Sequence, residues 1–291
     1  MTFAQLRTLV AVAEEGSVHA AARRLVVTDP AVSAAIASLG REVGHRLVAR
    51  EGRGVRLTPA GLTLAGYAAE ILGLEQQARR ELETAGPLRL AAVTTAGEYV
   101  LPAILKAFRG SHPDIQVSLD VGNRATVFDA LERHQVDLAV TGQPPSGRAL
   151  VGVPFLEHRL VVVAAPGTRA ADLSDATWLL RERGSGTRQT VERFLATAGI
   201  EPRSTMTLGS NGAVKQAAAV GLGVTLLSEQ ATAAEIAAGT LVRVDVPGTP
   251  IERRWYAVAP AHGPETAAAA RFRDFCLSED ARRALAAADP N

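Results

Sequence analysis

The fold is most strongly constrained by a change of pattern at Gly86-Pro87, where the chain passes from helical repeats to alternating strands and helices. From Leu88 onward, short β-branched apolar runs such as LRLAAVTT, DLAVTG and GVTLLS are separated by helical segments, including residues 99–110 and 124–134. That alternation is typical of an α/β fold with a mostly parallel sheet. A chain of 291 residues has room for about two domains. We therefore expect two kinds of unit that meet near residue 86.

Residues 1–58 contain three short helical patterns with clear start and stop signals. Gly16 ends the first helix, Ser17 caps the second, and Thr28-Asp29-Pro30 begins the third with a capping oxygen followed by proline. Three short helices of this kind predict a helix-turn-helix. The third helix also has an apolar face for the core, formed by Val32, Ile36 and Leu39.

Two strand-like runs follow, at residues 47–50 and 55–58, and a Gly-Arg-Gly turn separates them. This pattern predicts a β-hairpin, and a hairpin that follows a helix-turn-helix is a wing. We therefore place a winged helix-turn-helix domain at residues 1–58.

A long helix is predicted over residues 59–86, and we interpret it as a linker and dimerisation helix. Its apolar positions follow coiled-coil spacing, with Glu75 as a polar interruption. A long helix with one apolar stripe needs a partner, and an identical chain is the simplest one. We expect a homodimer as the basic state and a homotetramer as the assembled form. The stripe consists of Leu64, Ala68, Ile71, Ala78, Leu82 and Ala85.

Residues 87–291 exceed one small domain, and the connection at Pro166-Gly167 predicts a division into two lobes. We place lobe I at about 87–164 and 262–291, and lobe II at about 165–261.

Charge is distributed unevenly along the chain, although the formal net charge is only +1. The first 58 residues hold eight arginines and five acidic residues, so the helix-turn-helix segment carries +3 and the remainder −2. Cations contact phosphates, and short side chains on the third helix allow close approach to base edges. Taken singly, each arginine is better explained as ordinary solvated surface, and only the whole arrangement favours DNA contact. The predicted DNA contacts are Thr28, Asp29, Pro30, Ser33, Ala34, Ala37, Ser38, Arg50, Arg53 and Arg56.

Three segments of the C-terminal part, at residues 93–97, 183–188 and 209–213, share a design that suits anions. Each carries small hydroxyl or amide side chains and then opens a helix, where backbone N–H groups bind carboxylate or phosphate. If the segments converge between the lobes, the cleft suits a small anionic effector. The alternative is that these side chains are plain helix caps. The predicted effector contacts are Thr94, Thr95, Asn123, Arg124, Thr141, Ser185, Gly186, Thr187 and Asn211.

Catalytic and metal-binding patterns are weak in this sequence. The six histidines are scattered without zinc-ligand spacing, and neither a Walker-type loop nor a G-x-S-x-G elbow occurs. The single cysteine, Cys276, excludes an internal disulfide and fits a buried apolar position. We therefore predict no catalytic residues, no metal and no cofactor.

Membrane and export signals are also weak. No apolar stretch reaches the roughly 18 residues that span a bilayer, and the N-terminal stretch is predicted as a helix rather than a signal peptide. We expect a soluble, cytoplasmic protein without membrane contact. A solute-binding protein is an alternative that would need a signal peptide and would not need residues 1–85. An enzyme on the same two lobes is another, and it would need a nucleophile or cofactor site.

The residues from Phe3 through AVAEEGSVHAAARRLVVTDPAVSAAIASLGREVGHRLVAR to GVRLTPAG strongly resemble the N-terminal domain of LysR-type transcriptional regulators. The family's helix-turn-helix corresponds to about Val18–Ala37. The C-terminal part is similar to the family's effector domain, a pair of α/β lobes like those of periplasmic binding proteins. The resemblance implies a transcriptional regulator that binds a dyad operator in double-stranded DNA. Its DNA binding or activation would respond to a small anionic metabolite between the lobes, with RNA polymerase as a further partner.

The segments GNR at 122–124, GSGTR at 184–188 and LGSNGAVKQAAAVGLGVTLLS at 208–228 are similar to the branch that includes the regulator of Calvin-cycle genes. That similarity implies a phosphorylated or dinucleotide ligand. Two residues depart from the family pattern. Asp29 stands where Gln or Pro is common, and its carboxylate repels phosphate but could accept from cytosine N4. Gly40 replaces an acidic residue and weakens the helix end by about 1 kcal/mol.

Overall fold

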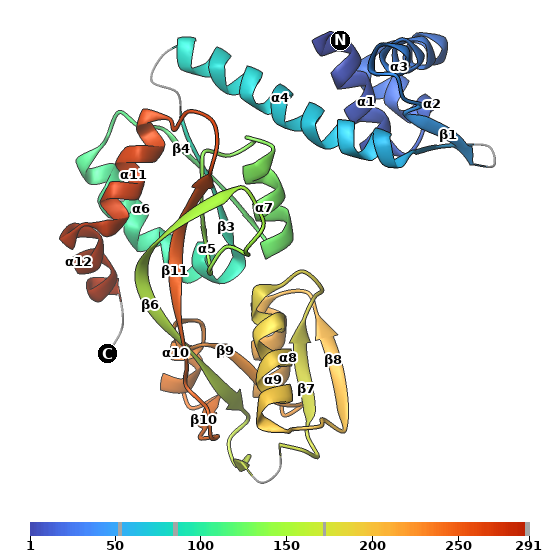
Figure 1. Cartoon of the computed structure of the whole chain (residues 1–291). Helices are drawn as coiled ribbons and strands as arrows, with labels where there is room; N and C mark the ends of the chain where they lie inside the picture. The colour runs from blue at the N-terminus through green and yellow to red at the C-terminus, as the bar shows by residue number, and fades with distance from the viewer. Residues whose placement is uncertain (52–53, 84–86, 171–172, 289–291) are drawn as a thin grey trace. The chain divides into compact units, whose positions relative to one another are not determined.

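The computed structural model describes residues 1–51, 54–83, 87–170 and 173–288 (Figure 1). The chain forms two compact units, one containing the elements α1 to α4 and the other containing β3 to α12. Within the described residues, no helix is long and apolar enough to cross a membrane.

The first unit begins with three capped helices, as the start signals predicted. The Ser17 hydroxyl accepts from the Ala20 backbone N–H, and the Thr28 hydroxyl accepts from that of Ala31, each at 3.4 Å. Gly16 adopts a left-handed φ of 63°, which favours glycine at this helix end. The buried residues Val32, Ile36 and Leu39 confirm the predicted core face of the third helix. The helices are α1 (Phe3–Glu15), α2 (Val18–Leu25) and α3 (Asp29–Val43).

Gly40 lies inside α3 rather than at its end. A Cβ at this position would stand 2.8 Å from the carbonyl oxygen of His45, so a larger residue would force the backbone apart. In this chain, Gly40 therefore permits a close approach of the His45 carbonyl to α3.

The predicted hairpin consists of β1 (Val48–Glu51) and β2 (Gly54–Leu57), which pair antiparallel with Val48 opposite Leu57. Residues 52 and 53, at the predicted turn, lie outside the described residues. Leu47 and Leu57 join the core formed by α1, α2 and α3.

Helix α4 (Pro59–Glu83) differs in part from the predicted stripe. Ala68 is fully buried and packs with Leu6 and Leu72 in a cluster between α1 and α4, so it does not face a partner. The polar interruption is also explained, because the Glu75 carboxylate pairs with Arg7 of α1 at 3.3 Å. Tyr67, Ile71 and Ala78 remain exposed. Leu82 and Ala85 lie outside the residues whose side chains are described.

In the second unit, the first lobe is built on parallel strands. β3 pairs with β4 on one side and with β5 on the other. Helices α6 and α11 cover one face of this sheet with a core that includes Phe108 and Phe272, and α7 covers the other with Phe128. The elements are β3 (Leu88–Val93), α5 (Thr94–Tyr99), α6 (Leu101–Ser111), β4 (Val117–Gly122), α7 (Arg124–Glu132), β5 (Leu138–Thr141), α11 (Ala267–Leu277) and α12 (Glu279–Ala288).

The second lobe has its own core around Trp178, which is fully buried. β7 and β8 are parallel, and a bridge from Trp178 to Val224 joins β7 to the start of β9. The elements are β7 (Thr177–Arg181), α8 (Gly186–Ala198), β8 (Ser204–Leu208), α9 (Asn211–Ala219), β9 (Thr225–Ser228), α10 (Glu229–Ala237) and β10 (Val242–Val244).

Two long strands connect the lobes, β6 (Leu150–Ala164) and β11 (Ile251–Pro260), and Figure 1 shows them running together from one lobe to the other. They pair antiparallel, and β6 also pairs antiparallel with β9 and β10. The prediction of a mostly parallel sheet is therefore wrong for these strands, because each passes from one lobe into the other.

The crossing strands also divide their side chains between the lobes. Leu160, Val162 and Ala164 of β6 pack around Trp178 in the second lobe, whereas Trp255 of β11 packs in the first-lobe core. The expected boundaries near residues 164 and 261 assigned each of these strands to a single lobe. The structure instead divides both strands.

Candidate functional site

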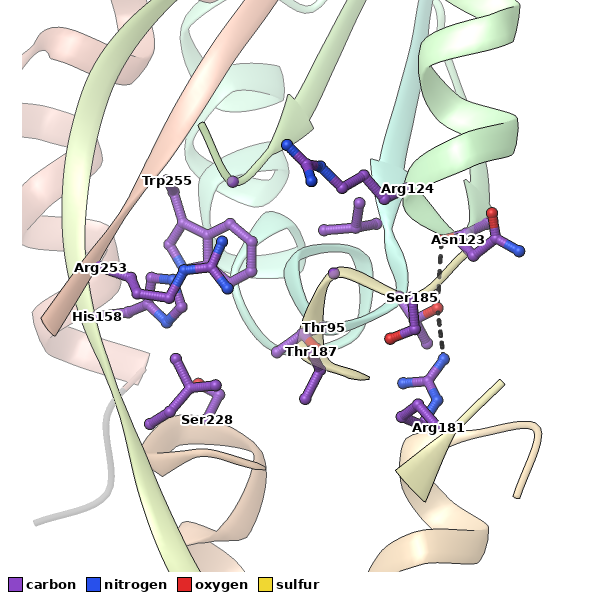
Figure 2. Close-up of a pocket in the computed structure, with 16 residues that line it drawn as sticks. Thr95, Asn123, Arg124, His158, Arg181, Ser185, Thr187, Ser228, Arg253 and Trp255 are labelled. Carbon is purple, nitrogen blue, oxygen red and sulfur yellow. Dashed lines mark hydrogen bonds between the residues drawn. The ribbon is translucent and has the colours of Figure 1, made fainter. Parts of the chain in front are cut away.

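A pocket between the two lobes gathers most of the predicted effector contacts (Figure 2). They come from the segments that follow β3, β4 and β7, at the first residues of α5, α7 and α8 or directly before them. We call this cavity the inner pocket. It is lined by seven of the nine predicted residues: Thr94, Thr95, Asn123, Arg124, Ser185, Gly186 and Thr187.

Local structure explains why these side chains face the cavity. Ser185 caps α8 by accepting from the Arg188 backbone N–H at 3.4 Å, and Asn123 accepts from the Thr126 backbone N–H at 3.1 Å in front of α7. The capping alternative therefore applies to Ser185, which caps α8 and lines the pocket at once. Asn123, which lies outside the three segments, lines the pocket while accepting in the same way in front of α7. The capping alternative does not apply to Thr95, since α5 has no side-chain cap, nor to Asn211, because Ser210 caps α9.

Two predicted residues do not line the inner pocket. Asn211 is fully buried behind it and donates from its amide to the Thr95 hydroxyl at 3.1 Å, which holds Thr95 in place. Thr141 is also fully buried, and its hydroxyl donates to the Gly142 carbonyl at 2.5 Å. Gly142 lines the pocket in place of Thr141.

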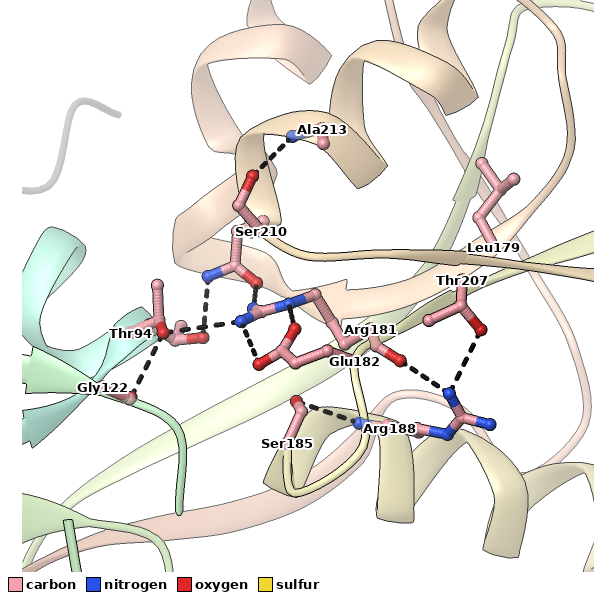
Figure 3. Close-up of polar contacts among 12 residues, drawn as sticks. Thr94, Gly122, Leu179, Arg181, Glu182, Ser185, Arg188, Thr207, Ser210 and Ala213 are labelled. Carbon is pink, nitrogen blue, oxygen red and sulfur yellow. Dashed lines mark hydrogen bonds and ion pairs between the residues drawn. The ribbon is translucent and has the colours of Figure 1, made fainter. Parts of the chain in front are cut away.

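A buried arginine, Arg181, connects the two lobes at the back of the pocket (Figure 3). Its guanidinium donates to the Asn211 side chain, to the Glu182 carboxylate at 2.8 and 3.0 Å, and to the Thr94 hydroxyl at 3.5 Å. Arg188 also donates to the Arg181 carbonyl and to Thr207. Because Thr94 belongs to the first lobe and Arg181 to the second, the network couples them.

Sequence reasoning missed five polar or aromatic residues that line the pocket, and three of them lie on the crossing strands. Arg253 and Trp255 alternate on β11 and therefore share a face, and His158 stands opposite Arg253 in the strand register. The sequence contained a signal for two of them, because Arg253 stands two positions before Trp255 in a strand-like run and the two side chains must share a face. Arg181 directly ends an apolar strand, at the position where ligands commonly bind in α/β folds. The missed residues are His158, Arg181, Ser228, Arg253 and Trp255.

Four lining residues have buried polar atoms without a hydrogen-bond partner. They are Nε of Arg124, both ring nitrogens of His158, Oγ of Ser228 and Nε1 of Trp255. A buried polar group without a partner costs about 1 to 3 kcal/mol, and native proteins contain few of them. Four in one cavity indicate that a polar ligand completes the site.

The charge of the pocket is positive. Among the described residues that line it there is no aspartate or glutamate, and no carboxylate lies within ion-pair distance of Arg124 or Arg253. Burial lowers the pKa of both arginines, and their neighbouring cations lower it further. Burial, together with the nearby Arg253 charge, lowers the pKa of His158 to about 3, and its ring stacks on Trp255 at 4.1 Å. An anion would relieve this uncompensated charge.

The predicted DNA contacts lie on and around α3. Ser33, Ala34 and Ala37 are exposed along it, whereas Ser38 is half-buried and accepts from the Gln5 amide at 3.3 Å. Asp29 faces the His19 ring nitrogen at 3.2 Å. Thr28 and Pro30 form the exposed start of the helix.

Of the three predicted wing arginines, the structure describes the side chain of one. Arg56 is exposed on β2. Arg50 belongs to β1, but its side chain lies outside the described residues, as does the whole of Arg53.

Two family descriptions match the chain. "Bacterial regulatory helix-turn-helix protein, lysR family" matches residues 3–62, and "LysR substrate binding domain" matches residues 82–281. The chain is 38% identical over 273 residues to a RuBisCO operon transcriptional regulator of Acidithiobacillus ferrooxidans, covering 89% of this chain and 88% of that protein.

Two solved structures extend the comparison. The Synechocystis CcmR regulatory domain in complex with 2-PG is 34% identical with a TM-score of 0.62, and covers 66% of this chain and 95% of its own. ArgP from Mycobacterium tuberculosis is 28% identical with a TM-score of 0.65, and covers 97% of this chain and 96% of its own. The relatives are named as transcriptional regulators rather than enzymes.

Proposed function

Because the chain belongs to the LysR family of bacterial transcriptional regulators, we propose that it binds an operator in DNA and that a small anionic metabolite in the inner pocket alters this binding or the activation that follows. The helix-turn-helix is the DNA-binding part, and the two lobes are the effector-binding part. Such coupling requires that the effector bind one arrangement of the protein better than another.

The DNA-binding surface is proposed to be the exposed start and outer face of α3 together with the hairpin. Short side chains at Ser33, Ala34 and Ala37 allow the helix to approach base edges in the major groove. Thr28, Asp29, Pro30 and Ser38 lie along the same helix. Arg50, Arg53 and Arg56 are proposed to contact phosphates or the minor groove.

The operator is proposed to be a dyad because the protein is proposed to be a homodimer. Tyr67, Ile71 and Ala78 are exposed at spacings of four and seven residues, which keeps them on one face of α4. A second copy of α4 would cover this face. A homotetramer and a contact with RNA polymerase are further steps of the same proposal. Because its target is chromosomal DNA, we place the protein in the cytoplasm.

The ligand proposal depends on one observation, the four buried polar groups that converge on the inner pocket without partners. The surrounding arginines favour an anion, and hydroxyl groups with the backbone N–H groups at the start of α8 favour phosphate or carboxylate oxygens. The 2-PG complex of the Synechocystis relative supports a phosphorylated ligand.

Calorimetric titration of the full chain with 2-PG and with inorganic phosphate tests this proposal. Ser228→Ala removes a hydroxyl that has no partner within the protein, so the fold should persist while affinity falls about fivefold, the equivalent of about 1 kcal/mol. Ser118→Ala, at an exposed position on β4, is the matched control and should leave affinity unchanged. No binding of either anion by the unaltered protein would contradict the proposal.

A further inference from the structure

The inner pocket continues into an open groove along α8, which we call the outer groove. Arg124, Gly186, His158 and Arg253 line both cavities, so the two are contiguous. Figure 2 shows Arg124 and Arg253 among the residues that line the inner pocket. Arg193 of α8 lines only the outer groove.

Three cations of the outer groove, Arg124, Arg193 and Arg253, lack a compensating carboxylate. Within the described part of the chain, no carboxylate lies within ion-pair distance of any of them. Arg254, which also lines the outer groove, is compensated by Glu157 at 3.1 Å. Arg124 instead donates to the Gln189 side chain at 2.7 Å, and Arg253 donates to the Thr190 hydroxyl at 2.5 Å. These are neutral acceptors, so three positive charges remain.

The three arginines also act on one another. The charge of Arg193 lowers the pKa of both Arg124 and Arg253, in addition to the larger effect of burial. Like charges held together without a counter-ion destabilise the protein that contains them. A bound anion would reverse that effect, which makes this cluster a candidate binding site.

Helix α8 runs from the inner pocket into the outer groove. Gly186, Gln189, Thr190 and Arg193 recur at helical spacing and line the outer groove. Gly186 also lines the inner pocket, whereas Arg193, seven residues further along the helix, lines only the outer groove. Arg193 therefore extends the positive charge of Arg124 and Arg253 beyond the inner pocket.

We propose that the outer groove is a second anion subsite, in which Arg193 with Arg124 and Arg253 binds a second negatively charged group of the same ligand. The proposal rests on the function proposed above and specifies its ligand class. The effector then carries two anionic ends, one in the inner pocket and one on Arg193. A ligand with one anionic group occupies the inner pocket alone.

Linear alkane bisphosphonates and alkyl monophosphonates of matched chain length test the proposal directly. Calorimetric titration of the full chain should show that a bisphosphonate of suitable length binds at least about tenfold more tightly than its monophosphonate, as expected for one added charge-assisted contact. Affinity should be greatest at one chain length, which is the length that places both anionic groups at once. Arg193→Ala should reduce the ratio to about twofold, the statistical advantage of two identical ends.

Arg203→Ala is the matched control, because Arg203 is an exposed arginine of the same lobe outside both cavities. It should preserve the ratio, which separates a local contact from a general loss of positive charge. A ratio of about two in the unaltered protein, or a high ratio that survives Arg193→Ala, would overturn the second subsite. The monophosphonate would still bind in that case, and the proposed function would stand. If neither series binds, the proposed function fails with it.

Discussion

His158 is neutral in the folded protein at physiological pH because burial and Arg253 lower its pKa to about 3, compared with about 6.5 for an exposed histidine. The unfolded chain takes up a proton at this residue as the pH falls below 6.5, whereas the folded chain does not. The free energy of unfolding must therefore fall between pH 6.5 and about pH 3.

The first prediction concerns this residue. Between pH 7 and pH 5, His158 should lower the free energy of unfolding by about 1 to 2 kcal/mol. Denaturant titration followed by tryptophan fluorescence reports on the correct unit, because Trp178 and Trp255 both belong to it. His158→Phe keeps a flat ring on Trp255 but cannot titrate, so its stability should depend less on pH. An equal pH dependence in both proteins would show that His158 is not buried as described.

Thr95 forms the floor of the inner pocket and is held by the Asn211 amide. Thr95→Trp should fill the cavity and abolish the response to 2-PG while DNA binding persists, as measured by mobility shift. Thr95→Val is the milder companion, since it removes the hydroxyl with little change of volume and should weaken the response without abolishing it. A full response in Thr95→Trp would mean that the effector binds elsewhere.

At the scale of elements, α4 has an exposed apolar face that includes Tyr67 and Ile71. A glutamate at each of these two positions should prevent a second copy of α4 from packing on this face. Tyr67→Glu with Ile71→Glu should raise the dimer dissociation constant about 100-fold, because about 3 kcal/mol of apolar burial is lost. Sedimentation equilibrium measures this constant. Leu62→Glu is the matched control, since Leu62 is as exposed as Tyr67, at 60%, but lies on another face of the helix. Equal effects of the two changes would exclude this face as the interface.

The elements also show what periodicity can and cannot predict. Helix starts in the first unit followed from local chemistry, since Ser17 and Thr28 bond the backbone a few residues away. The packing of Ala68 could not be predicted in this way, because apolar spacing does not distinguish contact with α1 from contact with a second chain. The strands that cross between the lobes were equally hidden. Only Leu160–Ala164 of β6 form a continuous apolar run, and this run does not show that the strand begins ten residues earlier.

In the inner pocket, too, local sequence predicted some of the contacts and not others. Seven predicted contacts were found because each belongs to a short segment that ends a strand and opens a helix. Arg253 and His158 were missed because they are neighbours only through the antiparallel register of β6 and β11. That register depends on the folded sheet and is not visible in local sequence.

At the scale of the whole molecule, the near-neutral net charge is the sum of a positive first segment and a negative remainder. The positive charge of the first 58 residues suits DNA. In the second unit, Arg124 and Arg253 line the inner pocket, and no described carboxylate lies within ion-pair distance of either. The proposed function therefore assigns two anionic partners to one chain, a polyanion at the first unit and a small metabolite at the second.

The central claim is that occupancy of the inner pocket changes binding to a specific DNA site. Selection of genomic fragments by the purified protein at physiological salt, followed by footprinting with and without 2-PG, measures both parts of the claim. We predict enrichment of fragments with two-fold symmetry, and a footprint that changes with 2-PG in the unaltered protein but not in Thr95→Trp. No enrichment over competitor DNA, or a footprint that responds equally in both proteins, would contradict the account.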